Sequence, residues 1–295
     1  MVQTKGFSGK IATVLVYFIV AVLALFCLMP IVHTIALSFS DKAAAMAGMV
    51  TFWPVKPTTA AYEAILKDRQ FWRSFLNSVY RVLLGGSVNM GLTILMAYPL
   101  SKTKKVFPQR NIYMWYLVFS MLFNGGLVPN YLLISELGLL DSIWSLILPG
   151  AVPIFNVIIL MNFFRGLPPE LEEAARIDGA NPWVILFRIF VPLAVPSIAT
   201  VTLFSIVGHW NSFFDGIIYI NSSAKLPLQS YMQQLVVEIQ ETSTMSQEEL
   251  QKMNELTSKN FNAAKVFVSM IPILLVYPFL QKYFVTGLVM GSVKG

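Results

Sequence analysis

Seven consecutive residues, His209-Trp-Asn-Ser-Phe-Phe-Asp215, gather most of the chemically versatile side chains found inside the apolar part of this sequence. Polar side chains are costly in a membrane, so they tend to face a cavity or a partner helix. Aromatic faces can stack on sugar rings, while amides and carboxylates can bond hydroxyl groups. The candidates for a weak carbohydrate path are therefore His209, Trp210, Asn211, Phe213, Phe214 and Asp215. A buried packing cluster is an equally open interpretation.

Asparagines in neighbouring apolar runs are second-rank candidates for the same path. They are Asn124 and Asn156, followed by Asn130 and Asn162. Each is more simply explained as a helix-to-helix hydrogen bond. Arg81 lies near the end of another apolar run, where snorkelling to the interface is the first explanation and binding of an acidic sugar a weaker one.

A charged stretch from Leu167 to Pro192 interrupts two apolar runs and predicts a helix, a tight turn and a second helix. Prolines suit a first helical turn, and the three glutamates that follow lie near the positive end of the helix dipole. Glu172 and Arg176 are spaced i,i+4 in the favourable order. Gly179 is placed to end the first helix and Asn181 to cap the next.

One face of the first of these helices carries small residues. Ala175 and Gly179 share that face, and Ala174 and Asp178 share the adjacent one. A partner backbone could therefore approach closely on a surface bordered by charge. The plainer alternative is an ordinary amphipathic connector.

The composition indicates which elements must position these residues. Hydrophobic residues make up 56% of the chain and charged residues 12%, and the mean hydropathy is +0.66, which predicts an integral membrane protein. The only cysteine, Cys27, lies in an apolar run, so an internal disulfide is excluded.

The apolar runs predict an all-α fold with six transmembrane helices in a single domain, residues 1–295. A bilayer core needs about 20 apolar residues per helix. The spans are expected at about 11–38, 75–100, 112–134, 143–164, 189–220 and 266–284, with the charged helix-turn-helix, 165–188, between the fourth and fifth. A cleaved signal peptide is a weaker reading of the first run, because its apolar region would be only about 7–15 residues long.

Loop charges predict the orientation. Residues 101–111 carry four basic residues and no acid, whereas residues 135–142 carry Glu136 and Asp141 and no base. Since Lys and Arg accumulate in cytoplasmic loops, both termini and the stretch 165–188 are expected in the cytoplasm. Segments 39–74 and 221–265 are then external, and 221–265 is expected to form one or two short surface helices.

Several other functions find no support in the sequence. No G-x-x-x-x-G-K-[ST] phosphate loop occurs, so an energy source would have to be another chain. The two histidines, His33 and His209, and the lone cysteine offer no metal-binding pattern, so no metal site is expected. No basic patch interleaved with aromatic residues suggests nucleic acid.

The stretch Glu173-Ala-Ala, three residues, Gly179, nine residues, Ile-Phe-Val-Pro192 resembles the EAA signature of ABC importer permeases, with Val191 where leucine is usual. The ending 282–295 is similar to the tail of the maltose-type carbohydrate permeases. The stretches 123–130, 138–144 and 208–215 look like the branch that serves complex oligosaccharides and includes alginate-type importers.

The resemblance implies one of two related permeases in the prokaryotic cell membrane, with a second homologous permease, two cytoplasmic ATPase subunits, an extracellular solute-binding protein and a sugar as its partners. ATP and Mg would bind to the ATPase chains and no cofactor to this one. The residues expected to couple to the ATPases are Glu172, Glu173, Ala174, Ala175, Asp178, Gly179 and Pro192. The alternatives are an intramembrane enzyme on lipid-linked or polymeric sugars, with His209 and Asp215 as acid and base, or an ATP-independent secondary transporter.

Overall fold

The computed structural model describes residues 7–238 and 258–292, and nearly all of them lie in helices. The long helices are α1 (Phe7–Ser38), α4 (Arg69–Ser101), α12 (Val195–Asn211) and α16 (Lys259–Ser292). Helices of intermediate length are α3 (Ala60–Lys67), α5 (Arg110–Leu122), α6 (Leu127–Glu136), α8 (Ile154–Gly166), α9 (Pro169–Ile177) and α14 (Leu228–Glu238). Short helices are α2 (Lys42–Met46), α7 (Ile143–Ile147), α10 (Pro182–Ile185), α11 (Val191–Leu193) and α13 (Phe214–Tyr219).

The chain divides into two compact units. The first is drawn from Met1–Arg69 and Leu235–Met270, and the second from Gln70–Gln234 and Ile271–Gly295. Within the first unit, the Tyr62 ring of α3 packs on Phe39 and its hydroxyl bonds to Ser38 Oγ (2.7 Å). The start of α16 is tied to the same unit because Asn260 Nδ2 donates to the Ser40 carbonyl (3.2 Å).

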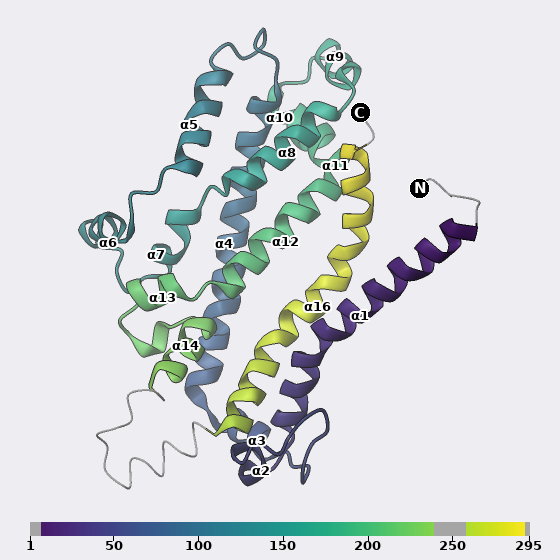
Figure 1. Ribbon diagram of the computed structural model, residues 1–295. Helices are drawn as coiled ribbons and strands as arrows, with labels where there is room; N and C mark the ends of the chain where they lie inside the picture. Colours follow the sequence, from purple (N-terminus) through teal and green to yellow (C-terminus); the bar gives the residue numbers. More distant parts are fainter. Residues whose placement is uncertain (1–6, 239–257, 293–295) are drawn as a thin grey trace. The chain divides into compact units, whose positions relative to one another are not determined.

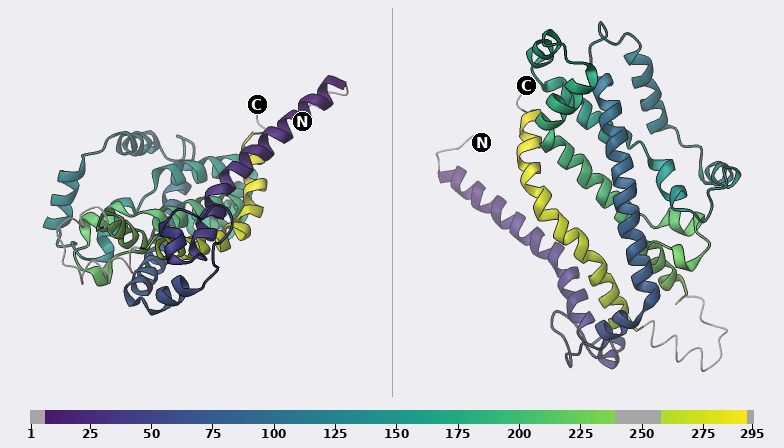
Figure 2. Two further views of the ribbon diagram at one scale, coloured as in Figure 1. Left: turned by 60° about the horizontal axis from the view of Figure 1, so that its bottom comes forward. Right: turned by 180° about the vertical axis from the view of Figure 1, so that it is seen from behind.

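Helix α4 is the uninterrupted axis of the second unit (Figures 1 and 2). One end of α4 meets the loop that leads to α5 and lies beside α9 and α10. Near its other end, Asn77 Nδ2 donates to the carbonyls of Ala224 (2.9 Å) and Leu226 (3.1 Å), just before α14. The second unit therefore has an α9 end and an α14 end, joined by one helix.

Apolar cores lie at both ends of the second unit. The larger core joins the end of α4 to α8, α9 and the segment 185–194, and includes Leu160, Phe164 and Ala175. The smaller core, which includes Leu146 and Tyr219, joins α6, α7 and α13.

Three of the predicted spans are bent pairs of helices. Helices α5 and α6 meet at 111°, Ile143–Gly150 and α8 at 48°, and Pro182–Leu193 and α12 at 83°. Among residues 7–238 and 258–292, three helices are long and apolar enough to cross a membrane, and up to six spans are reached if each bent pair counts as one. The spans expected at 112–134, 143–164 and 189–220 each contain a break between helices, which the apolar runs do not indicate.

Local sequence accounts for each bend. Gly126 adopts a positive φ of 91° between α5 and α6, in a conformation that few other residues tolerate. Pro149 and Pro153 flank the break before α8. Pro192 and Pro196 each lack the N–H that a continuous helix requires, and the segment Leu186–Phe190 before them is a π-helix.

Candidate functional site

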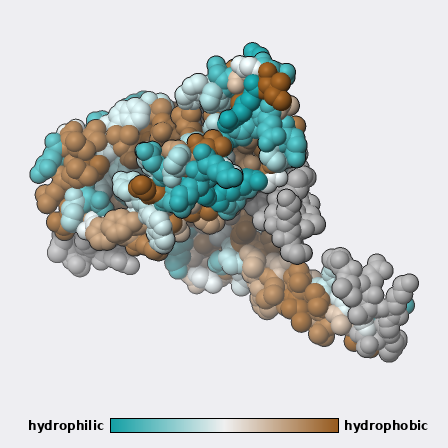
Figure 3. All heavy atoms as spheres, turned by 90° about the horizontal axis from the view of Figure 1, so that it is seen from above, coloured by the Kyte–Doolittle hydropathy of each residue, from teal (hydrophilic) through white to brown (hydrophobic). Residues whose placement is uncertain are grey.

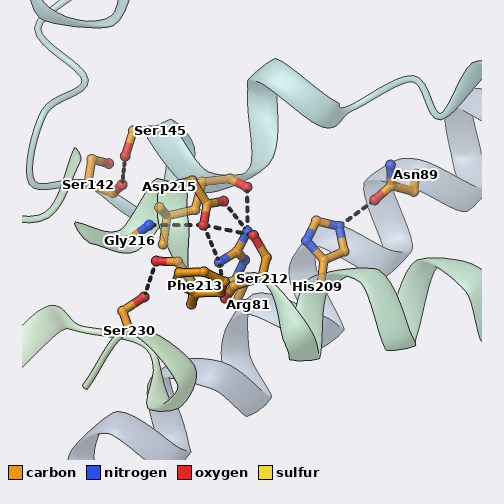
Figure 4. Close-up of polar contacts among 11 residues, drawn as sticks. Arg81, Asn89, Ser142, Ser145, His209, Ser212, Phe213, Asp215, Gly216 and Ser230 are labelled. Carbon is orange, nitrogen blue, oxygen red and sulfur yellow. Dashed lines mark hydrogen bonds and ion pairs between the residues drawn. The ribbon is translucent and has the colours of Figure 1, made fainter. Parts of the chain in front are cut away.

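A buried ion pair lies at the α12–α13 break. Arg81 on α4 is only 2% exposed, and its guanidinium binds both carboxylate oxygens of Asp215 (Figure 4), at 3.1 Å for Nη1 to Oδ1 and closer for Nη2 to Oδ2. Ser212 Oγ (2.8 Å) and the Gly216 N–H (2.9 Å) also donate to Oδ1. Arg81 does not snorkel, so that expectation is corrected: its charge is neutralised inside the unit.

The break itself brings Asp215 to this position. Helix α12 ends at Asn211, Ser212 is extended, and α13 begins at Phe214. Ser230 Oγ donates to the Phe213 carbonyl (2.8 Å), and a Cβ at Gly216 would lie 2.0 Å from Ser230 Oγ. Only glycine at 216 allows this close approach.

His209 lies one turn earlier and contacts α4 as well. Its Nε2 hydrogen-bonds Asn89 Oδ1, and a Cβ added at Gly85 would lie 2.6 Å from the imidazole ring. Asn89 Nδ2 in turn donates to the carbonyls of Gly150 (2.8 Å) and Ala151 (3.2 Å), which lie at the α7–α8 break. By contrast, a Cβ at Gly86 or Gly91 would meet no atom within 4 Å.

Polar side chains on α4 therefore satisfy the backbone at two helix breaks. Arg81 donates to the carbonyls of Leu146 and Ser212 (3.4 Å each), and Asn89 to those of Gly150 and Ala151. Irregular backbone at membrane depth must find such partners within the protein. His209 and Asp215 contact different partners, so they do not form the single acid-base unit of the enzyme alternative.

The remaining residues of the expected sugar path fall into two groups. Trp210 is buried with its ring edge-on to Phe75, and Asn156 Nδ2 donates to the Val201 carbonyl and to Ser205 Oγ (3.2 Å each). These two are packing residues of the chain. By contrast, Asn211, Phe213 and Phe214 are exposed.

Asn124 serves a turn. It lies at the α5–α6 break, where its Oδ1 accepts from the Gly126 N–H (2.9 Å). The side chain thus stabilises the bend of 111° between the two helices.

The α14 end carries an exposed clamp between two loops. Lys225 Nζ is 2.7 Å from Asp141 Oδ2, and Oδ1 accepts from the N–H groups of Asn221 (3.2 Å) and Ser222 (2.9 Å). These bonds hold the pKa of Asp141 below its usual range, first through Lys225 and then through the backbone donors. The loop of 137–142 and the start of 221–265 therefore lie together at one end of the unit.

The α9 end forms the predicted helix, turn and helix. Gly179 has φ +78°, and the Ala180 N–H donates to the Ala175 carbonyl (2.9 Å) while the Gly179 N–H donates to that of Arg176 (3.1 Å). This pair of bonds is a Schellman motif. Asn181 Oδ1 then accepts from the Val184 N–H (2.9 Å) and caps α10. The turn and both caps are confirmed.

The two faces of α9 differ from the expectation. Ala175 is 8% exposed and belongs to the apolar core of this chain, so little of its side chain is available to a partner. Glu173, Ala174, Asp178 and Gly179 are exposed, as is Pro192 in α11. Ile177, which the sequence interpretation passed over, is 87% exposed and is the most prominent apolar side chain of α9.

Glu172 points back into the chain. Its Oε2 lies 2.7 Å from Lys102 Nζ, and its Oε1 accepts from Arg176 Nη2 (2.8 Å), which confirms the i,i+4 pair. Beside this network is a hollow of roughly 440 Å³, lined by residues of α8, α9 and the loop after α4. In the sequence Lys102 is one of four basic residues of the loop 101–111, and no spacing rule links it to a residue 70 positions away.

Comparison with known proteins identifies the family. Residues 89–290 match the model described as binding-protein-dependent transport system inner membrane component. The chain is 40% identical over 291 residues to the polygalacturonan/rhamnogalacturonan transport system permease protein YtcP of Bacillus subtilis, covering 98% of this chain and 100% of that one. It is 41% identical over 268 residues to protein LplC of the same organism, covering 91% and 90%.

Solved structures agree. A chain in the crystal structure of a bacterial ABC transporter involved in the import of the acidic polysaccharide alginate matches with a TM-score of 0.85 and 31% identity, covering 95% of this chain and 98% of that chain. A bacterial alginate ABC transporter in complex with an alginate pentasaccharide-bound periplasmic protein matches with a TM-score of 0.54 at 17% identity, which shows the shared fold alone.

The family match covers more than half of the sequence and includes the α9 turn, the α12–α13 break and the stretch Glu173 to Pro192. Near-complete coverage of the relatives extends the likeness to α1 and the rest of the first unit. The resemblance on which the sequence interpretation relied is thereby confirmed. This chain belongs to the binding-protein-dependent transport system inner membrane components, as an ABC transporter permease of the carbohydrate type.

Proposed function

We propose that this chain pairs with a second permease of its family to form the membrane pathway of an ATP-driven importer for oligosaccharides cut from a polysaccharide. The observation that carries the proposal is identity of 40% along the whole chain to a polysaccharide transport permease. Two ATPase subunits bind at the α9 end, and an external solute-binding protein delivers the sugar at the α14 end.

The exposed side of α9 supports the ATPase assignment. Glu173, Ala174 and Asp178 surround Ile177, whose exposure of 87% is unusual for a large apolar side chain. Viewed from the α9 end, hydrophilic side chains gather over this part of the surface and apolar ones over the flanks (Figure 3). A charged border around one apolar knob fits a groove in a soluble partner, with Glu173 as the anchoring charge.

The exposed residues at the α12–α13 break support the sugar path. Phe213 and Phe214 are 42% and 54% exposed, next to the exposed amide of Asn211. Such rings stack on sugar faces without binding tightly, which suits release into the cell. His209, Trp210 and Asp215 position this surface from behind through α4 rather than contacting the sugar.

We further propose that the transported sugar is acidic. The named relatives serve polygalacturonan or rhamnogalacturonan and the acidic polysaccharide alginate. Arg81 supplies no free charge for such a cargo, because Asp215 neutralises it. Selection for acid groups is therefore assigned to the binding protein and to the second permease.

Reconstitution tests the proposal. The chain, purified from its own membranes, is expected to bring down a second permease and an ATPase. In proteoliposomes with the binding protein, uptake of galacturonate or mannuronate oligomers should require ATP and exceed uptake of neutral oligomers of equal length about tenfold. Preference for the neutral oligomers would overturn the acidic assignment. Uptake by the chain alone without ATP, or cleavage of the sugar, would overturn import and support the transporter or enzyme alternative.

A further inference from the structure

Helix α9 is joined to the rest of the second unit by few contacts. The chain enters it through Leu167 and Pro168 and leaves it through the turn at Gly179, and only Ala175 among its side chains is buried in the apolar core. The apolar contact between α9 and the rest of the unit is therefore small. The polar network around Glu172 is the other attachment.

The ammonium group of Lys102 is surrounded by two aromatic rings and a carboxylate. Its Nζ lies 3.8 Å from the centroid of the Tyr98 ring and 4.1 Å from that of the Phe190 ring, and 2.7 Å from Glu172 Oε2. The side chains of Lys102 and Glu172 are only 9% and 17% exposed. Cation-π contacts and ion pairs are stronger when shielded from water in this way.

The balance of charge supports a persistent bond. Burial lowers the pKa of Lys102, although hydrogen bonding to Glu172 opposes that effect. Burial raises the pKa of Glu172, but the hydrogen bonds from Lys102 and Arg176 outweigh it and hold that pKa below its usual range. The hydrogen bonds from Lys102 and Arg176 therefore favour the charged form of Glu172, which is the form that pairs with Lys102.

We propose that Lys102 and Glu172 form an internal clamp that transmits movement of α9 to α4, so that Glu172 is a positioning residue and does not dock the ATPase. The clamp joins three elements, since Lys102 follows α4, Glu172 lies on α9 and Phe190 ends the π-helix before α11. The inference rests on the proposed function, because it assigns the route by which ATPase movement enters the membrane.

The route continues along α4. A continuous helix rises about 1.5 Å per residue, so Arg81 lies about 30 Å from Lys102 along the axis. Along this stretch of α4, Asn89 hydrogen-bonds Gly150 at the α7–α8 break and His209. At the far end of the stretch, Arg81 binds Asp215 at the α12–α13 break. A displacement of α4 at the Lys102–Glu172 clamp is therefore passed to the α7–α8 break and to the α12–α13 break. The exposed Phe213 and Phe214 lie at the second of these breaks.

Neighbouring glutamates allow a sharp test. Lys102→Met keeps an unbranched side chain among the rings but removes the charge, and Glu172→Gln removes the partner charge. In the reconstituted complex, each is expected to lower the sugar taken up per ATP hydrolysed about tenfold while ATPase subunits still co-purify. Glu173→Gln is expected instead to weaken co-purification of the ATPase. Lys104→Met and Lys105→Met, which change exposed lysines of the same loop, are matched controls and should behave as wild type.

A double-mutant cycle separates a clamp from general damage. Lys102→Met combined with Glu172→Gln should be no worse than either single variant, and Lys102→Arg should recover most of the uptake per ATP. If the double variant lost uptake per ATP by the product of the two single losses, the clamp would be overturned. Loss of ATPase binding in Glu172→Gln would overturn it as well. The same cycle followed by thermal unfolding of the purified permease chain needs neither transport nor partner subunits, so coupling between the two residues remains measurable if the proposed function itself fails.

Discussion

At the scale of the residue, opposite charges in separate apolar segments are the most telling feature. Arg81 and Asp215 lie 134 positions apart, yet their side chains meet in a bidentate pair. Sequence reasoning treated each alone and placed Arg81 at the membrane interface. The available signal was that a charge is tolerated at such depth chiefly when a partner neutralises it, which makes any two opposite intramembrane charges a candidate pair.

Removal of one partner should therefore be costly. Arg81→Met leaves Asp215 without its main partner, and breaking a buried pair in this way costs about 3–5 kcal/mol. We expect the thermal midpoint of the purified complex to fall clearly, with loss of uptake. Arg73→Met, on an exposed position of the same helix, is the control. Equal stability of the two variants would mean that Arg81 reaches the interface after all.

At the scale of the element, the sequence indicates the long apolar runs but not the bends inside them. Hydropathy adds up along a window and carries no direction, so 112–134 scores as one span although α5 and α6 meet at 111°. Local chemistry did predict what short-range rules govern, namely the α9 turn at Gly179 and the Asn181 cap. The inward side of α9 depends on packing against α4 and α8, which no helical periodicity encodes.

Close packing on α4 gives a prediction with a built-in control. A methyl group at Gly85 would overlap the His209 ring at 2.6 Å, whereas one at Gly86 would meet nothing within 4 Å. Gly85→Ala should destabilise by about 1–3 kcal/mol through overpacking. Gly86→Ala should be neutral or stabilising by up to about 1 kcal/mol, because alanine favours the helix. The thermal unfolding midpoints of the two variants test this difference in stability. Equal midpoints would show that the His209 ring moves aside freely.

At the scale of the whole molecule, the described parts support a division of labour along the second unit. The α9 end presents a charged surface with one apolar knob, the α14 end carries the Asp141–Lys225 clamp, and α4 joins them. The sequence alone could name the family, because residue identity and spacing in the EAA stretch are local. The contacts that make α4 a transmission element join residues distant in sequence, and they required the structure.

Orientation in the membrane is the prediction that the whole molecule carries. The basic residues after α4 predict that the α9 end lies in the cytoplasm and that the Asp141–Lys225 end faces outward. With the sole native cysteine replaced as Cys27→Ala, Lys105→Cys should react with a membrane-impermeant maleimide only after the cells are opened. Ser223→Cys, also at an exposed position, should react in intact cells. The reverse pattern would put α9 beyond the reach of a cytoplasmic ATPase, and with it the proposed site of coupling.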